Sequence, residues 1–336
     1  MSTSYLLSKG LDVLNSQADR TLLTSNLNNA LVIARGFTVP YAGYPTNQTL
    51  AQSLRPFPQV SGSITPVWAP LGSSWYDSMQ AKLTKRFSRG LDVNASFTWG
   101  KELALGNGGN NGGLGGGIND MFNRPNQKSL SGGGKPFILV VSYNYQTPRV
   151  TANKFIRAVT GDWVFGGILR YTSGTLISVP SSNNAGMNNY TFMSNTRMNR
   201  VPGQTIWVKD PGCHCIDPNK DTALLNKAAW QDVTQGQWGF SAPTYSDYRW
   251  QRMANEQMSL GRTFYIGAER RVKLTTRIEM FNAFNRITLP APTSGNPAAN
   301  TTYNSLGQVT GGYGFINTLS GVGGARNGQG VVRLEF

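Results

Sequence analysis

Several features that commonly identify a function are scarce in this chain of 336 residues. Only 14% of the residues are charged, against roughly a quarter in an ordinary soluble domain. No run of about 18 apolar residues is present, which excludes a transmembrane helix. Residues 1–10 lack both a basic region and an apolar region, so we expect no secretory signal. With one histidine in the chain, no Ser/His/Asp triad is defensible.

Glycine and positive charge, by contrast, are abundant. The chain has 39 glycines and a formal net charge of +15. Such a charge attracts nucleic acid, anionic lipid or acidic polymers. The charge alone does not choose among these partners.

The clearest pattern is a strict alternation of apolar and polar residues, first seen from Leu91 to Trp99. Alternation with a period of two predicts a β-strand with one apolar and one polar face. Each such segment is about ten residues long, the length that a tilted strand needs to cross a bilayer. The predicted strands are 75–87, 91–101, 136–147, 162–172, 254–266, 272–283 and 328–336.

Short and long connections alternate between these segments. In an up-and-down sheet, this places every long loop at one end, as in transmembrane β-barrels. We therefore predict an all-β fold, an antiparallel up-and-down transmembrane barrel, present here as a partial barrel of about 7–8 strands. The eighth strand would end within residues 2–10. A soluble β-sandwich or propeller is the alternative, which loops of this length disfavour. The predicted long loops are about 11–74, 102–135, 173–253 and 284–327.

The two faces of the predicted sheet differ in chemistry. Aromatic residues such as Trp75, Trp99 and Trp163 lie on the apolar face near strand ends, where the aromatic girdles of membrane barrels sit. Charged residues on the other face would line a hydrated lumen. The predicted lumen-facing charges are Lys82, Arg86, Arg170, Lys273, Arg277 and Glu279.

Four stretches carry a resemblance to a known family. "YDSMQAKLTKRFSRGLDVNASFTWGK", "GDWVFGGILRYTSGTLISV", "MSLGRTFYIGAERRVKLTTRIEMFNAFNR" and the terminal "VVRLEF" resemble the C-terminal part of Oar-like TonB-dependent receptors, many of which carry a carboxypeptidase-regulatory-like domain. The resemblance implies a bacterial outer-membrane protein. Family members also carry a signal peptide, an N-terminal β-sandwich, a plug and 22 strands. We therefore interpret residues 1–336 as a C-terminal barrel fragment without a plug domain.

The loops hold few candidate chemical sites. Cys213, His214 and Cys215 are adjacent, which suits a local disulfide between the two cysteines, or a structured loop tip, better than a tetrahedral metal site. The glycine-rich run 106–117 lacks the Lys-Ser/Thr pair of a phosphate-binding loop. We expect no catalytic, cofactor-binding or metal-binding residues. Four loop tryptophans would either stack on a ligand or pack the long loop into a folded cap: Trp207, Trp230, Trp238 and Trp250.

The sequence leaves three functions open. The first, implied by the resemblance, is ligand import through a plugged barrel by a TonB-dependent receptor. Its partners would be outer-membrane lipid, the remainder of the receptor (plug and missing strands) and a TonB-type energy-coupling complex, and the ligand is left open. The second is a structural or adhesive surface protein. The third is a soluble basic β protein that binds polysaccharide or nucleic acid; under the first two readings, nucleic acid is not a partner.

Overall fold

The chain is described from a computed structural model. The structure describes residues 3–13, 15–61, 72–105, 119, 123–148, 156, 159–183, 197–213, 215–218, 220–221, 223–234, 238–266, 272–319 and 324–336.

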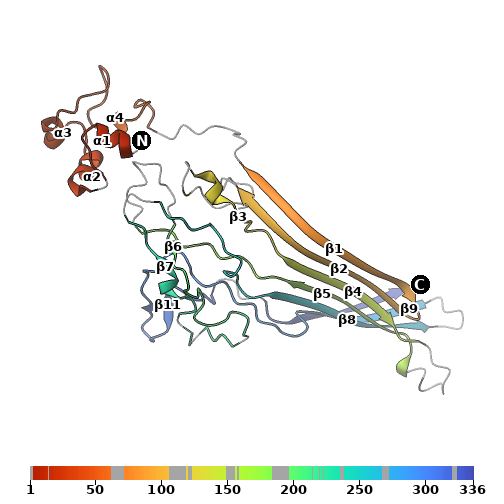
Figure 1. Cartoon of the computed structure of the whole chain (residues 1–336). Coiled ribbons are helices and arrows are strands. Elements are labelled where there is room, and N and C mark those ends of the chain that lie inside the picture. Colours follow the sequence, from red (N-terminus) through yellow and green to blue (C-terminus); the bar gives the residue numbers. More distant parts are fainter. Residues whose placement is uncertain are drawn as a thin grey trace.

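One long antiparallel sheet dominates the structure (Figure 1). Its seven long strands are hydrogen-bonded in sequence order, and each of the five inner ones pairs with the strand before it and the strand after it. The short strand β3 (Ser129–Leu130) adds to β2 as an eighth member. The long strands are β1 (Ser73–Ser88), β2 (Leu91–Leu105), β4 (Phe137–Gln146), β5 (Trp163–Thr172), β8 (Met253–Ile266), β9 (Val272–Phe281) and β12 (Asn327–Glu335).

This topology confirms the predicted up-and-down sheet and all seven predicted strands. The largest difference in bounds is in β2, which continues to Leu105 rather than ending at 101. Its last residues pair with Ser73–Trp75 of β1 and with β3, so partners on both sides extend the ladder. The sheet is open, because β1 and β12 lie at opposite ends of the strand order.

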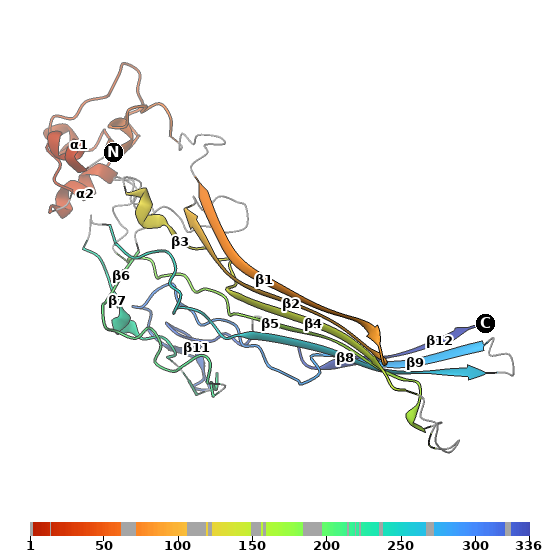
Figure 2. The ribbon, with the colours of Figure 1, turned by 45° about the vertical axis from the view of Figure 1, so that its right-hand side comes forward.

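The β1–β2 turn lies at the end of the sheet that holds the C-terminus, and the described parts of the long connections lie at the other end (Figures 1 and 2). We call these the turn end and the cap end. The β1–β2 turn places Arg89 and Gly90 at positive φ, 51° and 83°. A Cβ at residue 90 would lie 2.2 Å from the carbonyl oxygen of Gln146, so only glycine fits there. The short connection 267–271, between β8 and β9, lies outside the described residues.

The N-terminal residues form a small helical unit, and the prediction of a strand end within residues 2–10 is wrong. Here α1 (Thr3–Ser8) precedes α2 (Gln17–Thr24), α3 (Ala30–Ala34) and α4 (Leu50–Ser53). Leu6 and Leu11 are fully buried in the apolar cluster of this unit, so they face its core rather than a neighbouring strand. Residues 11–53, predicted as loop, therefore contain three capped helices.

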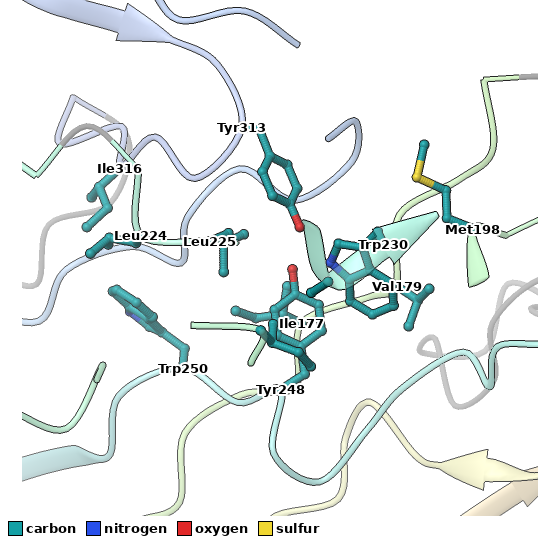
Figure 3. Packing of buried hydrophobic residues seen from close by; sticks show 12 residues of the cluster. Ile177, Val179, Met198, Leu224, Leu225, Trp230, Tyr248, Trp250, Tyr313 and Ile316 are labelled. Carbon is teal, nitrogen blue, oxygen red and sulfur yellow. The ribbon is translucent and has the colours of Figure 1, made fainter. Parts of the chain in front are cut away.

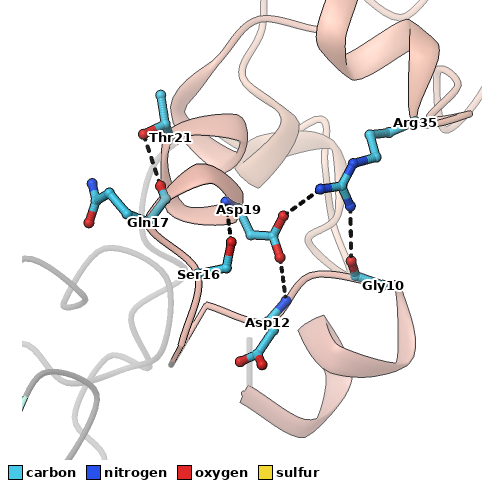
Figure 4. A network of polar contacts seen from close by, with 7 residues as sticks. All are labelled: Gly10, Asp12, Ser16, Gln17, Asp19, Thr21 and Arg35. Atoms are coloured by element: carbon cyan, nitrogen blue, oxygen red, sulfur yellow. Dashed lines mark hydrogen bonds and ion pairs between the residues drawn. The ribbon is translucent and has the colours of Figure 1, made fainter.

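A buried carboxylate holds the helical unit together (Figure 4). Asp19 is 5% exposed and accepts hydrogen bonds from the Asp12 amide and from Arg35, both at 2.9 Å. Its own amide donates to the Ser16 hydroxyl, which caps α2. One side chain thus ties the start of α2 to the segments on either side of it.

The long connections at the cap end fold into a second compact unit. We define the cap as the described residues of 173–252 and 282–326. It contains the paired short strands β6 (Asn199–Arg200) with β7 (Trp230–Gln231), and β10 (Thr302–Tyr303) with β11 (Val309–Gly311). The 3₁₀ helix η3 (Lys227–Ala229) leads into β7, and η1 (Arg124–Gln127) lies just before β3. None of the helices in the described ranges is long and apolar enough to cross a bilayer.

Candidate functional site

The strand register places the apolar residues on one face of the sheet. Opposite residues in neighbouring strands share a face, and the pairs Leu83–Ala95, Ala95–Val141 and Val141–Leu169 run in one row. Within the described residues, no second layer of protein covers most of this outer face; Glu256, at the cap end of β8, is buried at an outer-face position. Its exposed members include Met79, Leu83, Trp99, Phe165, Phe264, Ile278, Met280, Val332 and Leu334.

This exposure separates the membrane interpretation from the soluble one. A soluble sandwich would cover the outer face with a second sheet, whereas Trp99 is 62% exposed and Ile278 is 54% exposed. Monomeric soluble proteins rarely expose apolar surface of this extent. The outer face therefore has the properties of a lipid-contacting wall.

The opposite face carries most of the charges predicted to line the lumen. Lys82 and Arg170 belong to one row, through Ser96 and Val140. Arg277 contacts Glu279 on the same strand, and Lys273 lies 3.0 Å from Glu335 of β12. The register places five of the six predicted charges on this side of the sheet, which we call the inner face: Lys82, Arg170, Lys273, Arg277 and Glu279.

Arg86 is the exception among the predicted charges. It lies between Lys85 and Ser88, where the β1–β2 register shifts by a bulge. A bulged residue is left out of the ladder, so the alternation does not assign Arg86 to a face. The side chain is exposed at the turn end.

A cleft of about 760 Å³ lies where the cap end of β1 and β2 meets the segments that follow β3 and precede β8. Its volume is within the usual range for small-molecule sites. The charged residues of its lining are Asp77, Lys101, Glu102 and Arg249, and its apolar residues include Leu130, Pro136 and the outer-face residues Met79 and Trp99. Sequence reasoning missed Glu102 and Arg249, because both residues fall inside predicted loops.

Arg249 is held firmly at the edge of this cleft. Its guanidinium donates to the carbonyl oxygens of Gly174, at 3.0 Å, and Gly134, at 3.3 Å. Burial lowers the pKa of Arg249 below its ordinary value, and the group stays charged at neutral pH because its ordinary pKa is so high. The cleft therefore combines apolar walls with charged side chains of both signs, among them the fixed cation of Arg249 and the carboxylate of Glu102, which suits a ligand with both polar and apolar parts.

Two of the four loop tryptophans, Trp230 and Trp250, lie in the core of the cap (Figure 3), and a third, Trp207, packs against it. Trp230 and Trp250 are each 6% exposed, and Trp207 packs against them with its ring centre 5.9 Å from that of Trp250. Trp238 packs instead against the helical unit. The buried positions of Trp230 and Trp250 favour the packing role over ligand stacking.

Two tyrosines complete the centre of the cap. The hydroxyl groups of Tyr248 and Tyr313 point toward each other and toward the indole nitrogen of Trp230 (Figure 3). Burial raises the pKa of Tyr313 to about 12 and also raises the pKa of Tyr248. Both hydroxyls therefore remain protonated at every physiological pH.

Cys213 and Cys215 are joined by a disulfide, with their Cα atoms 5.1 Å apart. The loop around them is closed by Asp221, which accepts from the Lys209 ammonium and the Asp217 amide, both at 2.7 Å. Both contacts lower the pKa of Asp221, and the hydrogen bond from Lys209 has the larger effect. Among the described residues, no group of His, Cys, Asp and Glu side chains is placed to hold a metal ion. His214 and the run 106–117 lie outside those residues.

Comparison with known proteins identifies the family. The family model described as "Outer membrane beta barrel domain" matches residues 2–329, nearly the whole chain. No curated protein and no solved structure matches the chain. The family agrees with the exposed outer face and with long connections gathered at one end of an antiparallel sheet. The chain therefore belongs to the outer membrane beta barrel domain family and forms part of a barrel wall in the bacterial outer membrane.

Proposed function

We propose that this chain is the C-terminal barrel segment of a TonB-dependent receptor of the Oar-like type, which imports a ligand across the outer membrane. The observation that carries the proposal is the cleft of about 760 Å³ between the sheet and a folded cap. A receptor that captures scarce ligands needs such a site on the side of the membrane that carries its long loops.

In this proposal the chain's own residues perform binding and guidance. Glu102 and Arg249 orient the polar part of the ligand in the cleft, while Leu130 and Pro136 contact its apolar part. The charges of the inner face, such as Arg170, then solvate the path through the lumen. A plug, the remaining strands and an energy-coupling complex would act as partners. The proposal assigns no chemical step to this chain.

Uptake by the complete receptor tests the proposal. The receptor would be produced in the outer membrane of a bacterial host and offered a panel of labelled iron chelates, vitamins, oligosaccharides and peptides. We expect uptake of one class that stops when the energy-coupling complex is disrupted. Arg249→Gln and Glu102→Gln should weaken binding, whereas Arg333→Gln, at the turn end, should not. Normal assembly without energy-dependent uptake of any class would overturn the proposal.

A structural or adhesive role is the second candidate. The cap has its own buried core, so it presents a surface of fixed shape outside the sheet. Adhesion would appear as cell attachment that is lost with the cap but persists when the energy-coupling complex is disrupted. A strain whose receptor lacks the cap and a strain without the energy-coupling complex therefore separate the two functions.

A further inference from the structure

Three cations lie close together in the sequence at the β1–β2 turn. Lys85 and Arg86 come just before the turn and Arg89 lies in it, and all three are exposed. The described residues place no carboxylate within ion-pair distance of any of them. The stretch 85–90 contains no acidic residue. The turn therefore presents uncompensated positive charge to the surroundings of the sheet.

The neighbouring strand β4 fixes the shape of this turn. The Gln146 amide donates to the Gly90 carbonyl at 2.7 Å, and Ser88 pairs with Leu91 across the turn. Arg89 has a φ of 51°, in the left-handed region that residues other than glycine seldom adopt. The turn itself, rather than the preference of arginine, thus determines this conformation. The cations are held on a turn of defined geometry.

Two side chains connect the turn to the apolar outer face. Lys85 pairs with Val93, which shares the face of Ala95 and Val141, so Lys85 lies at the edge of the outer face. A further strand that joined the free edge of β1 would bond through the backbone and leave Lys85 on this face. Phe87 lies between the cations and is 59% exposed. Lysine can keep its stem on apolar surface and its ammonium in water, and aromatic rings are enriched at the same membrane level.

From this arrangement we propose that the β1–β2 turn binds the anionic phospholipid surface of the periplasmic leaflet. Headgroup phosphates contact Lys85, Arg86 and Arg89, and the Phe87 ring lies at the boundary with the acyl chains. The short turns of outer-membrane barrels face the periplasm, where the bilayer leaflet consists of phospholipid.

An anionic headgroup fits this turn better than a zwitterionic one, because a zwitterionic headgroup adds an ammonium that the three cations repel. A membrane surface fits better than a soluble acidic protein, because Lys85 belongs to the face of the sheet that contacts lipid. This inference depends on the barrel family and not on ligand import.

Native mass spectrometry of the complete receptor, purified from outer membranes and titrated with single lipids, tests the proposal. The triple variant Lys85→Gln/Arg86→Gln/Arg89→Gln should lower the affinity for phosphatidylglycerol by about five-fold for each cation that contacts the lipid. Its affinity for phosphatidylethanolamine should stay within about two-fold of the original. The matched control Lys9→Gln/Lys220→Gln/Lys227→Gln removes the same charge from the helical unit and the cap, and should retain both affinities.

Two single variants separate the charge from the apolar anchor. Arg89→Gly removes one cation and places at φ 51° the residue that adopts it most readily, so the turn should keep its shape. It should lower the affinity for phosphatidylglycerol by about five-fold. Phe87→Ser keeps all three cations and should weaken both lipids by a similar factor.

Heat-dependent mobility on gels shows whether each variant has assembled, and if the triple variant does not assemble, Arg89→Gly decides alone. Unchanged affinity for phosphatidylglycerol in the assembled triple variant, or in Arg89→Gly where that variant decides, would overturn the proposal. Unchanged lipid binding in Phe87→Ser would overturn the placement of its ring. Displacement of phosphatidylglycerol by soluble peptidoglycan fragments or by an acidic peptide would overturn the choice of a membrane surface.

Discussion

Replacing Trp250 distinguishes a packing tryptophan from a ligand-stacking one. Its indole is 6% exposed, and its nitrogen donates to the Leu289 carbonyl at 2.7 Å. Truncating a buried tryptophan to alanine costs about 3–5 kcal/mol. Trp250→Phe keeps most of the ring but leaves the Leu289 carbonyl without its donor, at a cost of about 1–3 kcal/mol.

Hydrogen exchange measures this loss inside the cap. The amides of Ile177 and Trp250 donate to Tyr248 and Thr175 and report on the opening of this core. A loss of about 4 kcal/mol corresponds to exchange that is roughly 700-fold faster, and about 2 kcal/mol to roughly 30-fold. If local opening controls exchange, the cap amides in Trp250→Ala should therefore exchange more than tenfold faster than those in Trp250→Phe.

The control is Phe240→Ala, which removes an aromatic side chain that is 74% exposed in the same loop. It should change exchange by less than about two-fold. If Trp250→Ala abolished ligand uptake and left exchange of the cap amides unchanged, the packing role would be refuted and ligand stacking would stand.

Three further changes test other parts of the molecule. Asp19→Ala removes the buried acceptor of Figure 4 and should destabilise the helical unit by about 2 kcal/mol, measured as faster limited proteolysis there. Lys209 holds the pKa of Asp221 below its ordinary value, so the stability from this contact is present above about pH 4 and is lost as the pH falls through the lowered pKa. Hydrogen exchange in the loop around the disulfide should therefore become faster at low pH, and Asp221→Asn should remove this pH dependence. Ile278→Arg on the outer face should destabilise the assembled barrel by up to about 4 kcal/mol in urea titrations, whereas Thr275→Arg on the inner face should not.

Each of these has a contradicting outcome. Unchanged proteolysis in Asp19→Ala would mean that the apolar cluster alone holds the unit. Loop exchange that stays pH-dependent in Asp221→Asn would assign the titration to another group. Equal destabilisation by the two arginine substitutions would contradict the assignment of inner and outer faces.

The long strands could be predicted because each carries its own alternation. In β2, the apolar residues from Leu91 to Trp99 specify both the strand and its outer face without reference to any other segment. Arg262 and Glu256 could not be predicted in this way, since both occupy outer-face positions that the pattern reserves for apolar residues. Glu256 is fully buried and lies 2.8 Å from Arg286, a partner 30 residues away. Long-range partners of this kind leave no local signal.

The helical unit and the cap show two different reasons for failure. The helices are short, four to eight residues, so their periodicity is weak. Their N-caps Ser16, Asn29 and Thr49 were signals that could have located them. The cap is built instead from pairings such as Trp207 with Leu225 and Leu176 with Arg249. These join distant segments, so only the folded chain shows that Glu102 and Arg249 line the same cleft.

The number of long strands limits how the barrel can be completed. Seven strands that alternate in direction leave β1 and β12 running the same way, both toward the turn end. If β12 paired directly with β1, the seam would be parallel in an otherwise antiparallel wall. Two copies with the same orientation in the membrane would meet the same obstacle at both seams. A fully antiparallel closure therefore needs an odd number of additional strands between β12 and β1, whichever polypeptide supplies them.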